Sequence, residues 1–416
     1  MTNIKFDKIT IRLTALSFLE FAIWGAYLTS MSIYLFKIGL GDKIGWFFAA
    51  QGIASIFMPA IIGIIADRWV AAQKMLSLCH LIAAIFMALT GYAGMTKGAE
   101  VTFTELFVPY TLSIMFFMPT IALSNSVSYN VLGKHGKNVI NIFPRIRVFG
   151  TIGFIISMWI IDLFGYKDSY NQFFTSATWG IIMSAYSLTI PSCPPSKSKE
   201  KRGFLSRLGL DAFRCLTEKR LATFFIFAML LGCALQISNG FTSVYLNSFA
   251  AEADYASTFT VQHPIIMTSL SQMSETLCIL LIPLFLGRYG IKKVITTAML
   301  AWAARFLLLA IGNPGSGVWL FILSMLIYGI AFDFFNIAGS LYVNKATDEN
   351  IRSSAQGLFM LMTNGLGASI GMIIAQFVVD YSLTNSGWQT AWYIFATYAI
   401  VIAILFTIFF HEKKIQ

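Results

Sequence analysis

Hydrophobic stretches of about 20 residues recur along the whole chain, and they restrict its fold more than any other feature. One of them, residues 318–343, reads "VWLFILSMLIYGIAFDFFNIAGSLYV". A stretch of this length crosses a bilayer as a helix, because the hydrocarbon core offers no water to the backbone polar groups. The 416 residues are 57% hydrophobic and 12% charged, which excludes a soluble globular domain. We therefore predict an all-α integral membrane protein.

We predict twelve spanning helices, joined by short loops except for one long central segment. Residues 192–219 are rich in Pro, Ser and Lys, and we interpret them as a cytoplasmic linker. The linker separates an N-terminal six-helix bundle, residues 1–191, from a C-terminal one, residues 220–416. Phe204, Leu205, Leu208 and Phe213 suggest that the linker touches the membrane surface. The predicted helices cover roughly 10–36, 44–66, 74–95, 104–132, 142–165, 171–191, 220–249, 264–287, 293–312, 317–343, 353–381 and 388–410.

The placement of Lys and Arg predicts the orientation in the membrane. With both termini in the cytoplasm, 24 of the 29 basic residues lie on the inner side and four in the outer loops. This asymmetry is the positive-inside pattern. It explains the net charge of +10 without nucleic acid. The polar start "MTNIKFDKITIR" does not resemble a signal peptide. The five cysteines show no paired or metal-ligand spacing, so we expect neither disulfides nor a metal.

Two pairs of similar segments indicate that the halves are repeats. The loops after the second and eighth helices read "GIIADRWVAAQK" and "FLGRYGIKK", and the fifth and eleventh helices contain "GTIGFII" and "GASIGMII". Each later copy lies about 220 residues downstream. Two six-helix repeats joined by a cytoplasmic linker are typical of the major facilitator fold. The glycines of the fifth and eleventh helices are most simply close helix contacts.

Polar side chains inside spans normally face the interior of a bundle or a cavity. Amide pairs of this kind also hold helices together, and an aromatic stripe is more often packing than a ligand platform. A purely structural role fits the carboxylates least well, because a carboxylate in an apolar span requires a partner or a proton. The groups at helical spacing are Arg147, Thr151 and Phe154; Gln236 and Asn239; Gln272 and Glu275; Tyr328, Phe332 and Phe335; and Glu20 with Trp24.

Asp333 lies deep in the tenth predicted helix. Arg305 lies at a similar depth in the ninth, so an Arg305–Asp333 pair is one expectation. At about 100° per residue, Asp333 shares a face with Asn336 and Ser340, away from the aromatic stripe. We interpret His80, deep in the third helix, as a satisfied interior group. Arg147 lies near the start of its helix, so the sequence also allows it to reach the cytoplasmic surface.

Several long segments closely resemble the bacterial nucleoside permeases, the nucleoside:proton symporters of the major facilitator superfamily. The resemblance runs from the first helix into the twelfth. It implies uptake of nucleosides, such as uridine and adenosine, with protons across the bacterial inner membrane, by a monomer that needs no other cofactor. The segments are "LSFLEFAIWGAYL", "FPRIRVFGTIGFI", "LLGCALQISNGF", "SLSQMSETL", "AFDFFNIAGS" and "SAQGLFMLMTNGLG".

The same resemblance implies roles for individual residues. Asp333 matches an acidic position that is a candidate for proton coupling, and Glu275 is a second candidate. Glu20 stands in "FLEF" where a familiar relative has Gln, so it either alters proton coupling or is paired and inert. The implied nucleoside contacts are Arg147, Thr151, Phe154, Gln236, Asn239, Gln272, Glu275, Tyr328 and Phe332.

The chemistry of these residues fits a nucleoside. Aromatic rings stack on a base, and Glu, Gln, Asn and Arg satisfy the ribose hydroxyls and the base edges. A neutral solute gains nothing from the membrane potential, so its accumulation requires a coupled ion. A sugar:proton symporter of the same fold is the nearest alternative. A membrane-embedded acyltransferase and a passive channel are the others, and the H-x-x-x-x-D spacing and Walker A segment of enzymes do not occur.

Overall fold

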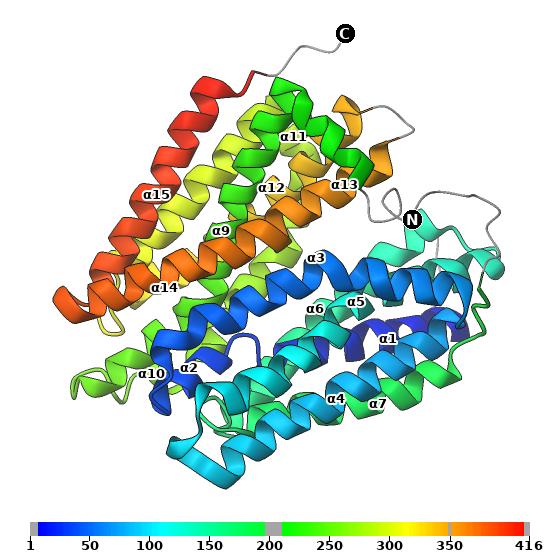
Figure 1. Ribbon diagram of the computed structural model, residues 1–416. Coiled ribbons are helices and arrows are strands. Elements are labelled where there is room, and N and C mark those ends of the chain that lie inside the picture. Colours follow the sequence, from blue (N-terminus) through cyan, green and yellow to red (C-terminus); the bar gives the residue numbers. More distant parts are fainter. Residues whose placement is uncertain (1–6, 196–209, 348–350, 412–416) are drawn as a thin grey trace. The chain divides into compact units, whose positions relative to one another are not determined.

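The computed structural model describes residues 7–195, 210–347 and 351–411, and the regular structure within these ranges is helical (Figure 1). The chain divides into two compact units. The first comprises residues 1–41 and 54–200, and the second comprises residues 42–53 and 201–416. The predicted linker bounds of 192–219 stay a prediction. Phe204, Leu205 and Leu208 lie outside the described residues, whereas Phe213 is exposed.

The first unit is a bundle in which α1 packs against α6 and α7, and α4 packs against α5 and α7. Asp7 caps the start of α1 by accepting hydrogen bonds from the backbone N–H and the hydroxyl of Thr10, at 3.1 and 2.6 Å. The Lys137 ammonium lies 3.0 Å from the same carboxylate. With the Thr10 hydrogen bonds, it lowers the pKa of Asp7 to about 2. The helices are α1 (Lys8–Gly25), α2 (Met31–Lys37), α4 (Ala72–Lys97), α5 (Phe103–Lys134), α6 (Val139–Leu163) and α7 (Asn171–Thr189).

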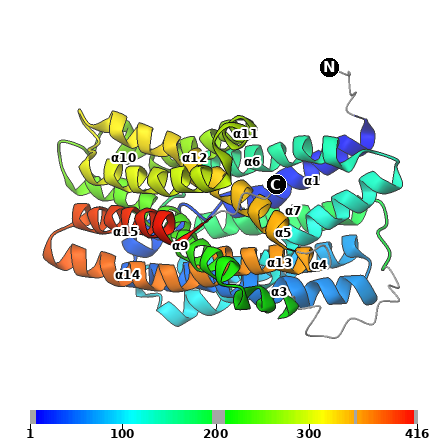
Figure 2. The ribbon, with the colours of Figure 1, turned by 90° about the horizontal axis from the view of Figure 1, so that it is seen from above.

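The second unit is built around α11, which packs along α12 and α15, while α9 packs against α14 (Figure 2). Helix α3 (Ile44–Arg68) belongs to both units, because residues 44–53 group with the second. The helices of the second unit are α9 (Lys219–Ser248), α10 (Phe259–Gln262), α11 (Pro264–Ile311), α12 (Val318–Ala346), α13 (Arg352–Met360), α14 (Ala368–Asn385) and α15 (Trp388–Phe409). Short 3-10 turns are Gly41–Lys43, Gly98–Glu100, Leu210–Thr217 and Phe249–Ala251.

Nine helices of the described chain are long and apolar enough to cross a membrane. The other three predicted spans also fall on helical segments, namely α1 with α2, α7, and the first part of α11. Within α11, Gly290 has φ 76° and ψ 171°, so the continuous element contains the break that the sequence predicts between the eighth and ninth helices. Glycine adopts such a conformation without strain because it lacks a Cβ atom.

The prediction of one continuous helix over residues 10–36 is wrong. Helix α1 ends at Gly25 and α2 begins at Met31. In the interruption the Ser30 hydroxyl donates to the side-chain oxygen of Gln172 at 2.9 Å. The same hydroxyl also lies 3.4 Å from the Ala26 and Tyr27 carbonyls, and local bonds of this kind compete with helical backbone bonds. A second irregularity is the π-helical turn Leu361–Gly367 between α13 and α14.

Glycines allow close helix packing in both units, as the sequence predicts. A Cβ atom on Gly153 of α6 would lie 2.2 Å from the Phe18 carbonyl oxygen of α1. A Cβ atom on Gly371 of α14 would lie 2.5 Å from the Cys233 side chain of α9. The same kind of contact therefore joins the first and fifth predicted helices and the seventh and eleventh.

We expect Gly153→Ala to destabilise the first unit by about 1–3 kcal/mol, because a methyl group there meets a backbone oxygen that cannot rotate away. Thermal unfolding of the purified protein in detergent measures the effect. Gly63→Ala is the control, since nothing lies within 4 Å of the added atom. That variant should be neutral or slightly stabilising, because Ala favours helix over Gly. Equal stability of both variants would contradict the close contact.

Candidate binding site and proton site

Two aromatic side chains of α12 form the centre of the candidate site in the second unit. The rings of Tyr328 and Phe332 stack with 5.7 Å between their centroids and 15° between their planes. This confirms that these two residues share one stripe of the helix. The side chain of Gln272 on α11 lies beside the Tyr328 hydroxyl. Phe335, the third residue of the predicted stripe, packs against Phe359 of α13 instead.

Arg305 holds three helices of this unit together from within. Its side chain is buried, and its guanidinium donates to the Ser238 hydroxyl of α9 at 2.9 Å and to the Ser324 carbonyl of α12 at 2.6 Å. It also donates to the Ser271 hydroxyl at 3.3 Å. The guanidinium carbon lies 4.9 Å from the Tyr328 ring centroid, within the range of a cation–π contact. Arg305 therefore fixes the segments that carry the predicted site residues.

The expected Arg305–Asp333 pair is wrong. The two residues form no ion pair in the described chain. The Arg305 guanidinium instead donates its hydrogen bonds to the two serine hydroxyls and to the Ser324 carbonyl. Asp333 is 4% exposed, and its Oδ2 atom has no hydrogen-bond partner among the described residues. It interacts electrostatically with Glu275 of α11. The neighbour of this buried carboxyl group is thus a second carboxyl group.

The predicted polar face of α12 is divided between local and tertiary hydrogen bonds. Asn336 donates to the Phe332 carbonyl of its own helix at 3.0 Å. Ser340 donates to the Gln356 side chain of α13 at 3.0 Å, and Gln356 donates back to the Ser340 carbonyl at 2.7 Å. Asn336 and Ser340 therefore stabilise the helix and its packing, whereas Asp333 has a buried oxygen without a hydrogen-bond partner in the described chain.

The remaining predicted residues of the second unit lie beside this cluster in sequence. Gln236 and Asn239 on α9 flank Ser238, which binds Arg305, and both are partly exposed. Gln272 and Glu275 on α11 are also partly exposed. The structure therefore brings together Gln272, Tyr328 and Phe332 by direct contact, and Glu275 with Asp333 by charge.

In the first unit, Arg147 lies against α1. Its guanidinium carbon is 3.8 Å from the ring centroid of Phe21. On the same helix, Phe154 is buried and meets Trp24 of α1 edge to face at 6.3 Å. Thr151, between them on α6, is partly exposed. Arg147 is thus stacked on a neighbouring helix of its own bundle.

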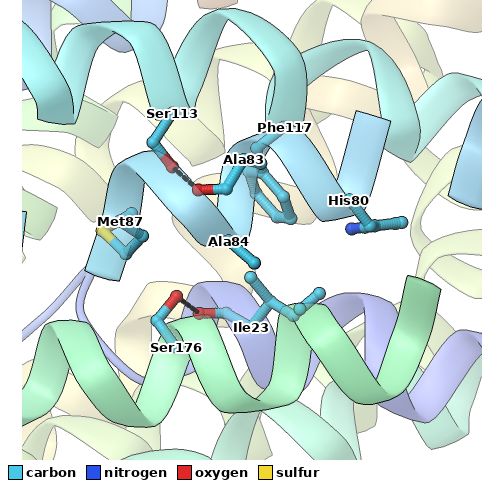
Figure 3. A pocket seen from close by; sticks show the side chains of 9 residues that line it. Ile23, His80, Ala83, Ala84, Met87, Ser113, Phe117 and Ser176 are labelled. Atoms are coloured by element: carbon cyan, nitrogen blue, oxygen red, sulfur yellow. Dashed lines mark hydrogen bonds between the residues drawn. The ribbon is translucent and has the colours of Figure 1, made fainter. Parts of the chain in front are cut away.

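Glu20 is completely buried in the first unit and is paired. Its Oε2 atom lies 3.0 Å from Nε2 of His80 on α4, and its Oε1 atom accepts from the Thr120 hydroxyl of α5 at 2.6 Å. Our interpretation of His80 as an interior group with its hydrogen bonds satisfied is correct only for Nε2, which pairs with Glu20. The other ring nitrogen, Nδ1, is buried without a hydrogen-bond partner in the described chain. The nearby cavity is lined by His80 and not by any predicted nucleoside contact (Figure 3).

Sequence reasoning missed the roles of Ser238, Ser271 and Thr120. A hydroxyl inside a span is common, so its presence gave no signal. The signal was the isolated charge: Arg305 and Glu20 each require buried partners, and small hydroxyl side chains supply them here. The structure describes no group of His, Cys, Asp and Glu suited to a metal among residues 7–195, 210–347 and 351–411.

Comparison with known proteins places the whole chain among one group of transporters. The family model described as "Nucleoside H+ symporter" matches residues 7–415. The chain is 43% identical to nucleoside permease NupG of Escherichia coli K12, over 98% of this chain and 97% of that protein. It is 44% identical to the xanthosine permease of the same organism, over 96% and 95%. A crystal structure of nucleoside transporter NupG superposes with a TM-score of 0.89 at 42% identity, covering 98% of this chain and all of that one.

Proposed function

This chain belongs to the nucleoside H+ symporter family, and we propose that it carries nucleosides such as uridine and adenosine into a bacterial cell together with protons. It is a multi-pass transporter of the major facilitator fold and not an enzyme. We propose that it lies in the inner membrane as a monomer. The distribution of Lys and Arg supports an orientation with both termini in the cytoplasm. The proton is the coupling ion, and no further cofactor is needed.

The observation that carries this proposal beyond family membership is the stack of Tyr328 on Phe332, held by Gln272 and Arg305. A fixed aromatic face suits a nucleobase, and each base–ring contact contributes about 1–3 kcal/mol in other proteins. Gln236, Asn239 and Glu275 offer hydrogen bonds to ribose hydroxyls and to base edges. A sugar:proton symporter would use similar polar groups and fewer stacking rings.

In the first unit, Arg147, Thr151 and Phe154 are the proposed nucleoside contacts. Arginine offers a planar set of donors that matches a base carbonyl, and a threonine hydroxyl both donates and accepts. The Phe21 ring beneath Arg147 holds the plane of its guanidinium. Phe154 and Trp24 supply an aromatic edge on the same face of the bundle.

Uptake of labelled uridine and adenosine into proteoliposomes, with and without a pH gradient, tests the function. We expect accumulation only when the outside is more acidic, and competition by nucleosides but not by hexoses. Competition by hexoses alone would favour the sugar:proton alternative. Equilibration without accumulation under the same gradient would indicate a passive pathway.

We expect Arg147→Lys to lower uridine transport severalfold or more, because Lys keeps the charge but loses the planar fork and its stacking on Phe21. Initial uptake rates in proteoliposomes measure this. Arg145→Lys is the matched control, since Arg145 is exposed two residues earlier on the same helix. Full transport by the Arg147→Lys protein would show that position 147 requires only a charge near the membrane surface.

A further inference from the structure

A carboxylate and an imidazole lie side by side in the interior of the first unit. Glu20 of α1 and His80 of α4 approach to 3.0 Å, and both side chains are 0% exposed. Thr120 of α5 donates to the second oxygen of Glu20 at 2.6 Å. Three helices thus contribute to one buried polar group. Such a group is costly in an apolar bundle unless every member is satisfied.

One atom of this group has no partner. Nδ1 of His80 is buried and unpaired within the described part of the chain, although neutral and charged imidazoles both use that nitrogen as a donor or an acceptor. His80 also lines a small cavity, together with Ser113, Phe117 and Ser176 (Figure 3). The cavity volume is about 10 Å³, at the lower limit of the space that one water requires.

Two serine hydroxyls lie in the wall of this cavity, whose other lining is mostly apolar. The Ser113 hydroxyl donates to the Ala83 carbonyl at 2.7 Å, and the Ser176 hydroxyl donates to the Ile23 carbonyl at 2.9 Å (Figure 3). Both serine oxygens keep lone pairs that accept from a water. A water in turn accepts from an Nδ1–H group. His80 therefore borders a small cavity with two hydroxyl groups in its wall.

The protons of the pair can be counted. One proton occupies the hydrogen bond between Nε2 of His80 and Oε2 of Glu20. With Nδ1 bare, the pair carries a net charge of −1. When Nδ1 gains a proton, the pair becomes neutral overall, either as imidazolium with carboxylate or, after the shared proton moves to Oε2, as imidazole with carboxylic acid. A buried group without net charge avoids the cost of removing a charge from water.

The other titratable or charged groups around the pair come from each helix packed against it. Cys79 of α4 interacts electrostatically with Glu20. Arg147 of α6 lies over Phe21, the residue after Glu20. Tyr110 of α5 packs on Tyr27 of α1. On α7 the cavity is lined by Ser176 and Gly180, and Tyr186 bonds to the Arg12 carbonyl near the end of that helix.

We propose that Glu20 and His80 together form a buried proton-binding site, which takes up one proton at Nδ1 of His80. The pair acts as one unit because the same hydrogen bond links both residues. Thr120 is a positioning residue, because its hydroxyl holds the Glu20 carboxylate in place and does not itself take up the proton. This site lies in the first unit, whereas the Glu275–Asp333 pair lies in the second.

The direct test is nitrogen-15 NMR of a protein in which His80 is the only histidine. The chain has four histidines, so His135, His263 and His411 are each changed to Asn. We expect both ring nitrogens of His80 to change in one common step as the pH is lowered, with Nδ1 gaining the proton. Glu20→Gln removes the carboxylate charge and should displace that step. Glu100→Gln, at an exposed position, should leave it in place.

Constant resonances across the pH range would overturn the proposal, and so would an identical step in the Glu20→Gln protein. If the triple-Asn protein does not fold, selectively labelled wild-type protein compared with His80→Gln gives the same assignment. The relevance of this proton site to uptake rests on the proposed function. Exchange of uridine without a pH gradient tests that function separately from the proton site. Absence of uridine exchange by the wild-type protein would refute nucleoside transport. The change in the His80 NMR signals tests the proton site by itself.

Discussion

Glu275→Gln should weaken uridine binding by about 5- to 150-fold, the equivalent of roughly 1–3 kcal/mol. Glu275 accepts hydrogen bonds with both carboxylate oxygens when ionised, whereas Gln has one accepting oxygen and presents a donor in place of the other. A ribose hydroxyl facing that donor is left unmatched. Isothermal titration calorimetry on the purified protein measures the affinity. Glu252→Gln, an exposed change in the same unit, should leave the affinity unaltered.

Gln272→Ala should weaken binding by a similar factor, and by two routes. The variant loses a polar contact to the nucleoside and also the polar contact between Gln272 and Tyr328. Tyr328→Phe keeps the ring and removes only the hydroxyl that faces Gln272. The double variant then separates the routes, because the two effects add only if the residues act independently. Wild-type affinity in both Glu275→Gln and Gln272→Ala would remove this part of α11 from the binding site.

Periodicity and composition were sufficient to predict features that depend on one helix. The i, i+4 spacing of Tyr328 and Phe332 predicts a shared face, and their rings stack. The glycines at 153 and 371 predict close packing, and in each case an added Cβ atom meets the neighbouring helix. Such features follow from the repeat of about 3.6 residues per turn, which the sequence determines directly.

Features that depend on how neighbouring helices are rotated were not predictable in this way. Arg305 and Asp333 lie at similar depths, but depth says nothing about the direction in which each side chain leaves its helix. The guanidinium turns toward Ser238 and Ser324, whereas Asp333 lies near Glu275. Residues 20, 80 and 120 likewise meet only because three helices pack together.

We propose that Asp333 carries the coupled proton, and the arrangement around it supports this role over a structural one. A buried structural carboxylate is normally hydrogen-bonded, and Oδ2 of Asp333 has no such partner in the described chain. Its electrostatic neighbour is Glu275, so two negative charges would repel each other in an apolar surrounding. Holding one proton removes this repulsion. Glu275 also belongs to the proposed nucleoside site, which links proton occupancy to substrate binding.

We therefore expect Asp333→Asn to retain uridine exchange across proteoliposome membranes but to lose accumulation driven by a pH gradient. Asn has the shape of the protonated carboxyl group and cannot release a proton. With a gradient of about one pH unit, each coupled proton supports up to about a tenfold concentration ratio, and this ratio should fall to about one. Both activities are measured in the same vesicles, with the exposed Asp254→Asn as the control.

The opposite outcome is equally informative about the location of the proton. If Asp333→Asn protein still concentrates uridine when only a proton gradient is imposed, Asp333 is structural, and Glu275 or the Glu20–His80 pair carries the coupled proton. Glu20→Gln in the Asp333→Asn background then decides between these two. Loss of the remaining accumulation would assign coupling to the first unit, where Glu20 and His80 share a hydrogen bond. If accumulation of uridine is retained, Glu275 is the remaining candidate for the coupled proton. In that variant Glu275 has no acidic neighbour at position 333.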